Sequence, residues 1–245
     1  MKRIKIINLT ATVVCILLYA NHTQAQQKMK TESTLSPKEQ NIISISALTA
    51  KGDLNKLKTA LNTGLDAGLT INEIKETLVH LYAYCGFPRS IRGLQTFMQV
   101  LNERKAKSSN DNIGNNTSNI DKTGSKYERG KRILEELTKT PQPRTLTGYS
   151  AFAPTIDTFL KEHLFADIFE RDVLNYVQRE LVTVSVIASI SRAEPMLLSH
   201  LTICLNVGLT PEQLLQLVSI IKSTIGKKEA KSAQKVLDEV LKNRK

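Results

Sequence analysis

The chain has 245 residues, and 41% of them are hydrophobic. It contains no tryptophan and carries a formal net charge of +11. This length allows one large domain or two small ones, and this hydrophobic content can build a core. The positive charges are spread over expected helix faces and no aromatic-rich basic strand accompanies them, so we expect a solvated basic surface and no nucleic-acid partner.

Residues 1–25 have the order of a secretory signal peptide. Three basic residues in the first five positions precede an apolar segment, residues 6–20, and Thr23-Gln24-Ala25 supplies small residues before a cleavage point. The apolar segment is too short and too interrupted for a membrane span. We therefore expect cleavage near Ala25, an exported protein that is periplasmic or secreted, and no stable membrane span after cleavage.

The first half of the chain, residues 35–105, carries the start and stop signals of four helices. We expect them at about 37–51, 54–67, 71–84 and 88–105. Ser36-Pro37-Lys38-Glu39 is a capping box, and Thr70 with Glu73 makes a second one at the start of the third helix. Gly86 ends the third helix and Pro88 starts the fourth.

Residues 106–126 are rich in Ser, Asn, Asp, Gly and Lys, which is typical of a flexible linker. An amphipathic helix is expected at about 126–137. Thr140-Pro141-Gln142-Pro143 then forces an extended turn, and residues 144–168 are expected to be irregular or to form short helices.

The second half, residues 127–243, repeats the first. Gly68-Leu69-Thr70 matches Gly208-Leu209-Thr210, and Gly86 matches Gly226 at the same offset. No segment shows a convincing strand alternation. The sequence therefore predicts an all-α fold built as a tandem repeat of one helical unit, with the halves related by a pseudo-twofold axis.

The stretch 180–208 holds the candidate site. It reads as a helix, a break at Ala193-Glu194-Pro195 and a second helix that ends at Gly208. Glu180 has apolar neighbours at helical spacing, so its carboxylate should be buried and should need a partner. The short break would fold the helices back antiparallel and bring Glu180 to His200, as in a general acid/base pair. A purely structural hydrogen bond is an equally weighted alternative.

The two halves differ at the positions that could carry chemistry. His200 corresponds to Ala60, and Cys85 corresponds to Ile225. One explanation is that one half carries the functional site and the other half supplies residues that line it. The other explanation is that a structural repeat has diverged in sequence without any functional cause. Cys85 and Cys204, which remain after signal cleavage, could form a disulfide in an oxidising compartment or stay as buried free thiols.

Several spaced motifs recur in order in the two halves. They are Leu35-Ser36-Pro37-Lys38-Glu39, Asp66-Ala67-Gly68-Leu69-Thr70, Tyr84-Cys85-Gly86-Phe87-Pro88, Arg179-Glu180-Leu181-Val182-Thr183 and Asn206-Val207-Gly208-Leu209-Thr210. Together they resemble the carboxymuconolactone decarboxylase family, which shares its fold with alkylhydroperoxidase D-like proteins. The resemblance covers about 35–101 and 174–237, as in a two-repeat member with an exported leader.

The resemblance implies homo-oligomers, often trimers or hexamers, and two chemistries. The peroxidase branch uses Cys-x-x-Cys before the histidine, but residues 191–196 contain no cysteine, which disfavours the dithiol route. The decarboxylase branch acts on a small lactone dicarboxylate and would use Glu180 and His200. Arg89 and Arg92 could bind an anionic substrate, or they could simply lie on a solvated helix face. Tyr84 flanks the same turn and could either contact the substrate or serve only in packing. Neither a cofactor nor a metal is expected.

Three functions remain open at this point. The first is a decarboxylase-like lyase that acts on a small organic acid or lactone through Glu180 and His200. The second is a non-catalytic helical module that binds a ligand or a partner. The third is a thiol peroxidase of peroxiredoxin type that uses Cys85 or Cys204.

Overall fold

The structure is a computed structural model that describes residues 34–120 and 122–244. The chain divides into two units, Met1–Leu35 and Ser36–Lys245, and every helix discussed below belongs to the second. The expected signal peptide lies outside the described residues. Within the described part, no helix combines the length and the apolar character needed to cross a membrane.

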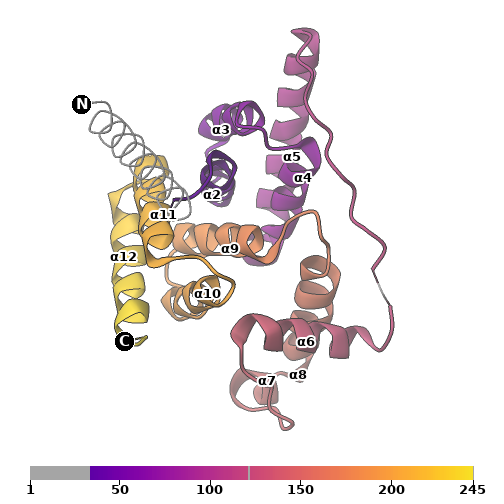
Figure 1. Cartoon of the computed structure of the whole chain (residues 1–245), viewed down its shortest axis with the longest axis vertical. Coiled ribbons are helices and arrows are strands. Elements are labelled where there is room, and N and C mark those ends of the chain that lie inside the picture. The colour runs from indigo at the N-terminus through magenta and orange to yellow at the C-terminus, as the bar shows by residue number, and fades with distance from the viewer. Residues whose placement is uncertain (1–33, 121, 245) are drawn as a thin grey trace, which may run out of the picture. The chain divides into compact units, whose positions relative to one another are not determined.

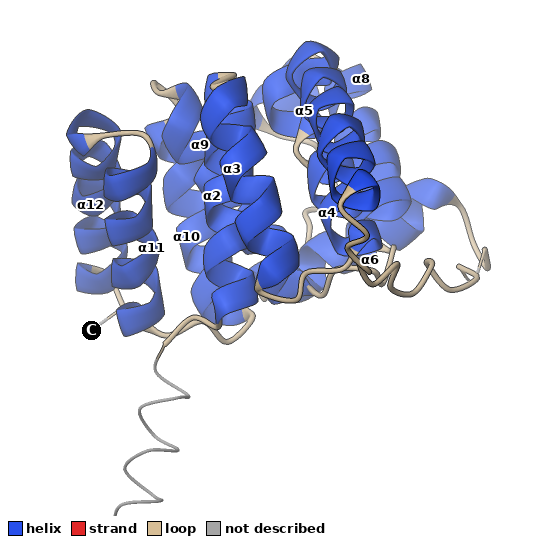
Figure 2. Cartoon of the chain, turned by 90° about the horizontal axis from the view of Figure 1, so that it is seen from above, coloured by secondary structure: helices blue, strands red, loops and turns tan. Residues whose placement is uncertain are grey.

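The described residues contain helices and no strand, which confirms the all-α prediction (Figure 2). The helices are α2 (Pro37–Lys51), α3 (Leu54–Asp66), α4 (Ile71–His80), α5 (Tyr82–Ala106), α6 (Lys126–Thr138), α7 (Gly148–Phe152), α8 (Pro154–Thr158), the π-helix η1 (Phe159–Phe169), α9 (Tyr176–Ile190), α10 (Glu194–Asn206), α11 (Pro211–Thr224) and α12 (Lys227–Lys242).

The predicted tandem repeat is visible in the order of the helices. Helices α2 to α5 correspond one by one to α9 to α12. Gly68 and Gly208 follow the second helix of each repeat with φ of 89° and 106°, a left-handed conformation that glycine adopts without steric cost. The third helix of each repeat then starts with a capping box, at Thr70 and at Thr210.

The capping signals act locally, which is why the sequence predicts them well. The Ser36 hydroxyl accepts from the Glu39 amide, and the Glu39 carboxylate accepts from the Ser36 amide at 2.7 Å. Two amides that the first turn of α2 would leave unpaired are thereby satisfied. Pro37 at the first helical position lacks an amide proton and removes another unpaired donor.

The boundary between α4 and α5 differs from the predicted one. The predicted third helix runs to about Tyr84, but α4 ends at His80 and α5 begins at Tyr82. Leu81 between them keeps helical angles, with φ of −66° and ψ of −15°. The actual break lies at the predicted position, Gly86, where φ is 80° and ψ is 161°, and Pro88 follows it.

Helix α9 forms the centre of the core. Eleven consecutive residues, from Arg179 to Ser189, are buried, because α9 contacts helices of both repeats: α2, α4 and α5 of the first and α10, α11 and α12 of the second (Figure 1). Helices α2 and α9, the equivalent first helices of the repeats, pack against each other. A helix buried on all sides must pair every polar side chain that it carries.

The segment between α5 and α6 is non-helical over most of its length and is bonded to α4. The amides of Ile71 and Asn72, in the first turn of α4, donate to the carbonyl oxygens of Asn112 and Ile113 at 2.9 Å. The segment therefore satisfies donors that a helix start leaves free. Its flexibility, predicted from composition, stays a prediction.

Residues 144–168 form short helices, which is one of the two predicted outcomes, and they continue into the longer helix η1. They contain α7, α8 and most of η1, and η1 packs against α6. Their shared apolar cluster comprises Ile133, Leu137, Leu164, Phe165, Ile168, Phe169 and Ile203. This contact with α6 covers η1, and long-range packing of this kind leaves no local signal in the sequence.

Candidate functional site

The structure brings Glu180 of α9 and His200 of α10 together. The chain reverses between the two helices at Ser191 and Arg192, whose φ values are 62° and 60°. His200 Nδ1 lies 2.9 Å from Glu180 Oε2. The Glu180 side chain is 0% exposed, whereas the His200 side chain is 14% exposed. The imidazole therefore lies between a buried carboxylate and the surface.

The geometry fixes which imidazole nitrogen carries the proton. An ionised carboxylate only accepts hydrogen bonds, so Nδ1 of His200 carries a proton and donates it to Glu180. In the neutral imidazole, Nε2 then has a free lone pair. This is the arrangement of a general base that is held by a carboxylate. The catalytic role of the two residues stays a prediction.

Tyr84, from the first repeat, packs beside this pair. Its ring meets the His200 ring edge-on, with centroids 5.8 Å apart and planes at 85°. On another side it packs against His80, at 5.6 Å between centroids. Its hydroxyl is buried near the Thr183 side chain, and neither it nor Glu180 Oε1 makes a hydrogen bond of good geometry among the described residues.

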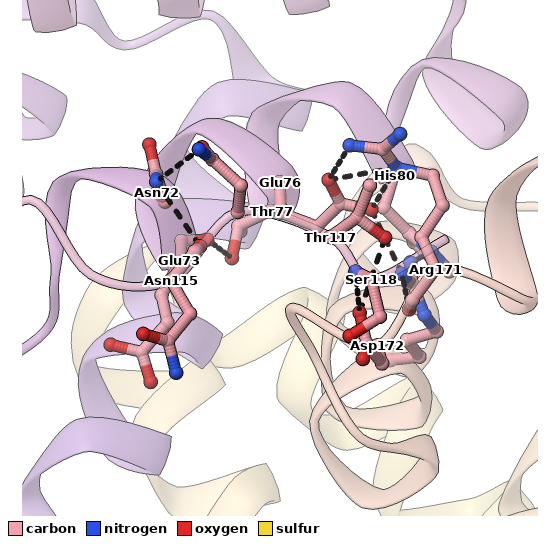
Figure 3. A network of polar contacts seen from close by, with 12 residues as sticks. Asn72, Glu73, Glu76, Thr77, His80, Asn115, Thr117, Ser118, Arg171 and Asp172 are labelled. Atoms are coloured by element: carbon pink, nitrogen blue, oxygen red, sulfur yellow. Dashed lines mark hydrogen bonds and ion pairs between the residues drawn. The ribbon is translucent and has the colours of Figure 1, made fainter. Parts of the chain in front are cut away.

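A second polar network lies in the same region and joins the repeats (Figure 3). The Glu76 carboxylate of α4 accepts from Arg171 Nη2 at 2.9 Å and from Arg179 Nη2 at 2.8 Å. The side chains of Glu76 and Arg179 are 3% and 0% exposed. A buried carboxylate between two guanidinium groups has its charge compensated and its oxygens bonded.

Arg179 also sets the tautomer of His80. Its Nη1 lies 3.0 Å from His80 Nδ1, and because a guanidinium can only donate, Nδ1 must accept. The proton of the neutral imidazole is then on Nε2, which donates to Thr183 Oγ1 at 2.9 Å. His80 is thus held as a neutral group between α9 side chains.

The network shifts the pKa values of its members. Burial opposes ionisation of Glu76, but hydrogen bonds from Arg171 and Arg179 outweigh it and lower the pKa of this carboxyl. Burial, followed by the charge of Arg179, lowers the pKa of His80 well below its usual range. Burial and then the charge of Glu180 raise the pKa of Tyr84, so its phenol stays protonated.

Arg89 and Arg92, the predicted substrate-binding arginines, are exposed on α5. Arg92 Nη1 donates to Gln95 Oε1 at 2.7 Å, and the Arg89 guanidinium lies against Gly52. Within the described part of the chain, neither forms a hydrogen bond or ion pair with Glu180 or His200. Their role in substrate binding stays a prediction.

The two cysteines of the described residues are free thiols, so the disulfide alternative is not realised. Cys85 Sγ donates to the Leu81 carbonyl oxygen at 3.2 Å, and burial raises the pKa of this thiol to about 11. Burial also raises the pKa of Cys204 well above its usual range. Because the thiolate is the reactive species, both environments disfavour thiol chemistry.

One cavity lies away from His200, and the described residues hold no cluster suited to a metal ion. A cavity of about 720 Å³ is lined by polar residues that include Thr70, Glu73, Asn115 and Asp172, and none of the residues around His200 contributes to it. Residues 34–120 and 122–244 contain no group of three or more His, Cys, Asp or Glu side chains suited to a metal ion.

The predicted site omitted Glu76, Arg179 and Arg171, which form the second network. Glu76 and Arg179 fall within or beside the recurring motifs, and Arg179 precedes Glu180 in a helix with few other charged residues. That position is the signal that could have identified Arg179 as a buried arginine. Its partner lies 103 positions away, which no local pattern indicates.

Comparison with known proteins gives two findings. A family model described as "Carboxymuconolactone decarboxylase family" matches residues 18–97 and 154–239. A 4-carboxymuconolactone decarboxylase from Acinetobacter baylyi is 26% identical over 119 residues, which span 48% of this chain and 88% of that protein. The two matched regions of the family model agree with the two helical repeats.

Proposed function

The chain belongs to the carboxymuconolactone decarboxylase family, and from this premise we propose that it is a decarboxylase-like lyase acting on a small organic acid or lactone. Glu180 and His200 are its proton-transfer pair. The observation that carries the proposal is their 2.9 Å contact, which joins a fully buried carboxylate to an imidazole that is partly exposed.

The pair suits a decarboxylation in which a proton replaces the departing carboxylate. When the carbon–carbon bond to the carboxylate breaks, carbon dioxide leaves and the electron pair stays on the lactone. A protonated His200 donates its Nε2 proton to the lactone carbon that receives the electron pair. Before this transfer, the Glu180 carboxylate stabilises the imidazolium. Solvent then returns the proton to Nε2 from the exposed side.

The remaining expectations belong to the same proposal. Arg89 and Arg92 lie on the exposed face of α5, where they could attract the carboxylates of a substrate. Tyr84 forms a wall beside the imidazole. The order of residues 1–25 supports export after their removal. The family resemblance supports a homo-oligomer.

The direct test is carbon dioxide release from 4-carboxymuconolactone, the substrate in the name of the Acinetobacter relative. We expect wild-type turnover and a 10²- to 10⁴-fold lower kcat for His200→Asn and Glu180→Gln, the usual range for a lost general acid or base. His163→Asn is the matched control, because His163 also faces a carboxylate, Asp167, but is 51% exposed. Equal rates for all three variants would refute the assigned pair.

A non-catalytic helical module is the second candidate. The observation that favours it is the complete burial of Glu180, which would equally suit a structural hydrogen bond to His200. Wild-type protein that binds lactones without releasing carbon dioxide would support this candidate. The peroxidase candidate is disfavoured, because burial raises the pKa of both described thiols.

A further inference from the structure

Four large apolar side chains between α6 and α9 face solvent, and we call them the apolar patch. Tyr149 and Phe152 of α7 are 63% and 93% exposed, and Ile156 of α8 and Phe159 of η1 are 48% and 60% exposed. The members of each pair are three positions apart, so they share a helix face. Helix α7 packs against α8 and α8 against η1, and the two short helices lie at the edge of the molecule (Figure 1).

Polar residues of the same short helices point inward, which reverses the usual arrangement of a surface helix. The Asp157 carboxylate of α8 is buried and accepts from Lys161 Nζ at 2.6 Å and from the Tyr127 hydroxyl of α6 at 2.7 Å. The Ser150 hydroxyl of α7 donates to the same carboxylate. Helices α7 and α8 thus turn a polar side toward α6 and an apolar side toward solvent.

The base of the apolar patch is firmly held. A Cβ atom added at Gly130 of α6 would lie 1.8 Å from the Lys161 carbonyl oxygen, so the backbones of α6 and η1 are in direct contact. The Asp157–Lys161 pair, whose side chains are 6% and 4% exposed, joins α8 to η1 at the same place. The exposed side chains are therefore presented by a preorganised surface, which lowers the entropic cost of docking a partner on it.

The area of the apolar patch matches that of a small specific interface. A large aromatic side chain can bury about 150–250 Å², so the four exposed fractions amount to roughly 400–650 Å² per chain. That is the upper range for the largest apolar patch of a monomeric protein. Two such patches placed face to face bury roughly 800–1,300 Å², close to the minimum of about 1,000 Å² for a specific interface. Further area comes from the exposed residues Ala151, Ala153 and Pro154.

Charge indicates which partner fits the apolar patch. Asp157 is the only charged residue of the segment 145–160, and its charge is buried and compensated by Lys161. The patch is therefore neutral on a chain of net charge +11, and two copies can meet there without opposing like charges. An anionic membrane surface attracts clusters of Lys and Arg, whereas residues 144–160 contain a single basic residue, Arg144.

We propose that the apolar patch is a twofold interface through which two copies of this chain pair, with Phe152 at its centre. A twofold axis brings the same surface of both copies together, so apolar side chains meet apolar side chains. Phe152 is the most exposed of the four, and aromatic residues at the middle of an interface contribute most to binding. The inference rests on the proposed function only for the homo-oligomer, to which it gives a surface, and involves neither Glu180 nor His200.

The test uses two variants of the full chain with opposite charges at one position, Phe152→Asp and Phe152→Lys. Sedimentation velocity at micromolar concentration measures the mass of the assembly. We expect the wild type to sediment as a dimer or as an assembly of dimers, and each variant alone at half that mass, because like charges then face each other across the twofold axis. An equimolar mixture of the two variants should recover the wild-type mass, since Asp then faces Lys.

Met98→Asp is the matched control, because Met98 is an apolar residue of α5 that is 63% exposed and lies outside the patch; it should keep the wild-type mass. Far-UV circular dichroism checks that the variants fold. A monomeric wild type, variants that keep the wild-type mass, or a mixture that does not recover it would each overturn the interface. So would a monomeric wild type that co-sediments with phosphatidylglycerol vesicles and loses this binding in Phe152→Asp, since the patch then contacts a membrane. Paired chains that release no carbon dioxide would refute the lyase and leave the interface standing.

Discussion

The Glu76 carboxylate of α4 accepts a 2.8 Å hydrogen bond from the Arg179 guanidinium of α9, across 103 positions of sequence. The bond joins the two helical repeats. Because both side chains are almost fully buried, the pair exists only when the repeats are correctly docked. Glu180, the next position on α9, lies 2.9 Å from the imidazole of His200.

Removing the Glu76 carboxylate should destabilise the protein strongly. Glu76→Ala leaves Arg179 as an uncompensated buried charge, and breaking one side of a buried ion pair costs about 3–5 kcal/mol. Urea denaturation measures the free energy of unfolding. Glu103→Ala is the control, because the Glu103–Lys58 pair is 49% and 43% exposed and should cost less than about 1 kcal/mol. Similar losses in the two variants would contradict a buried pair that holds the repeats together.

What the sequence predicts well is local. The capping boxes at Ser36 and Thr70 need only residues within one helical turn, and both are present. Gly86 breaks α5 because a left-handed φ followed by Pro88 disfavours a continuous helix. The Glu180–His200 contact is also nearly local, since a break of a few residues forces two adjacent helices to run antiparallel.

What the sequence does not predict depends on docking between distant helices. Glu76 looks like an ordinary solvated helix residue until α9 is placed against α4. The same holds for η1, whose apolar face becomes interpretable only once α6 covers it. For Arg89 and Arg92, the sequence indicates a place near the site because both follow the Gly86 turn. In the structure their side chains are exposed on α5.

Acid should destabilise the protein in two steps. The pKa of His80 is lowered by folding, so the unfolded chain takes up this proton first, and stability falls as the pH drops below about 6.5. The lowered pKa of Glu76 adds a second loss below about pH 4.5. Thermal unfolding between pH 8 and 2 should show both steps. His80→Gln should remove the first step, and His163→Gln should leave it in place. A wild-type Tm that is independent of pH from 7 to 5 would refute the assignment of the first step to His80.

Cys85 and Cys204 should be nearly inert at neutral pH. With a pKa of about 11, only about one Cys85 in a thousand is a thiolate at pH 8. Reaction with Ellman's reagent should therefore be slow at pH 8 and faster toward pH 11, and guanidinium-unfolded protein serves as the fully reactive control. Hydroperoxide turnover with dithiol reductants should be negligible. Peroxidase activity that disappears in a Cys85→Ser, Cys204→Ser double variant would overturn this expectation.

The Glu180–His200 pair should be energetically coupled. His200→Ala leaves a carboxylate with 0% exposure without its hydrogen bond, which costs about 1–3 kcal/mol for a buried polar group. Glu180→Gln in the same background replaces the unpaired charge by a neutral amide and should recover part of that loss. A double-mutant cycle from urea denaturation should therefore give a coupling energy of about 0.5–3 kcal/mol.

The matched cycle uses His163 and Asp167, an exposed pair with a similar distance of 3.1 Å, whose coupling should stay below about 1 kcal/mol. The difference between the cycles measures what burial adds to the same chemical contact. If the Glu180–His200 coupling is no larger than this control, the buried carboxylate does not hold the imidazole. The proton-transfer pair then loses its physical basis, and a non-catalytic helical module becomes the better account of the site.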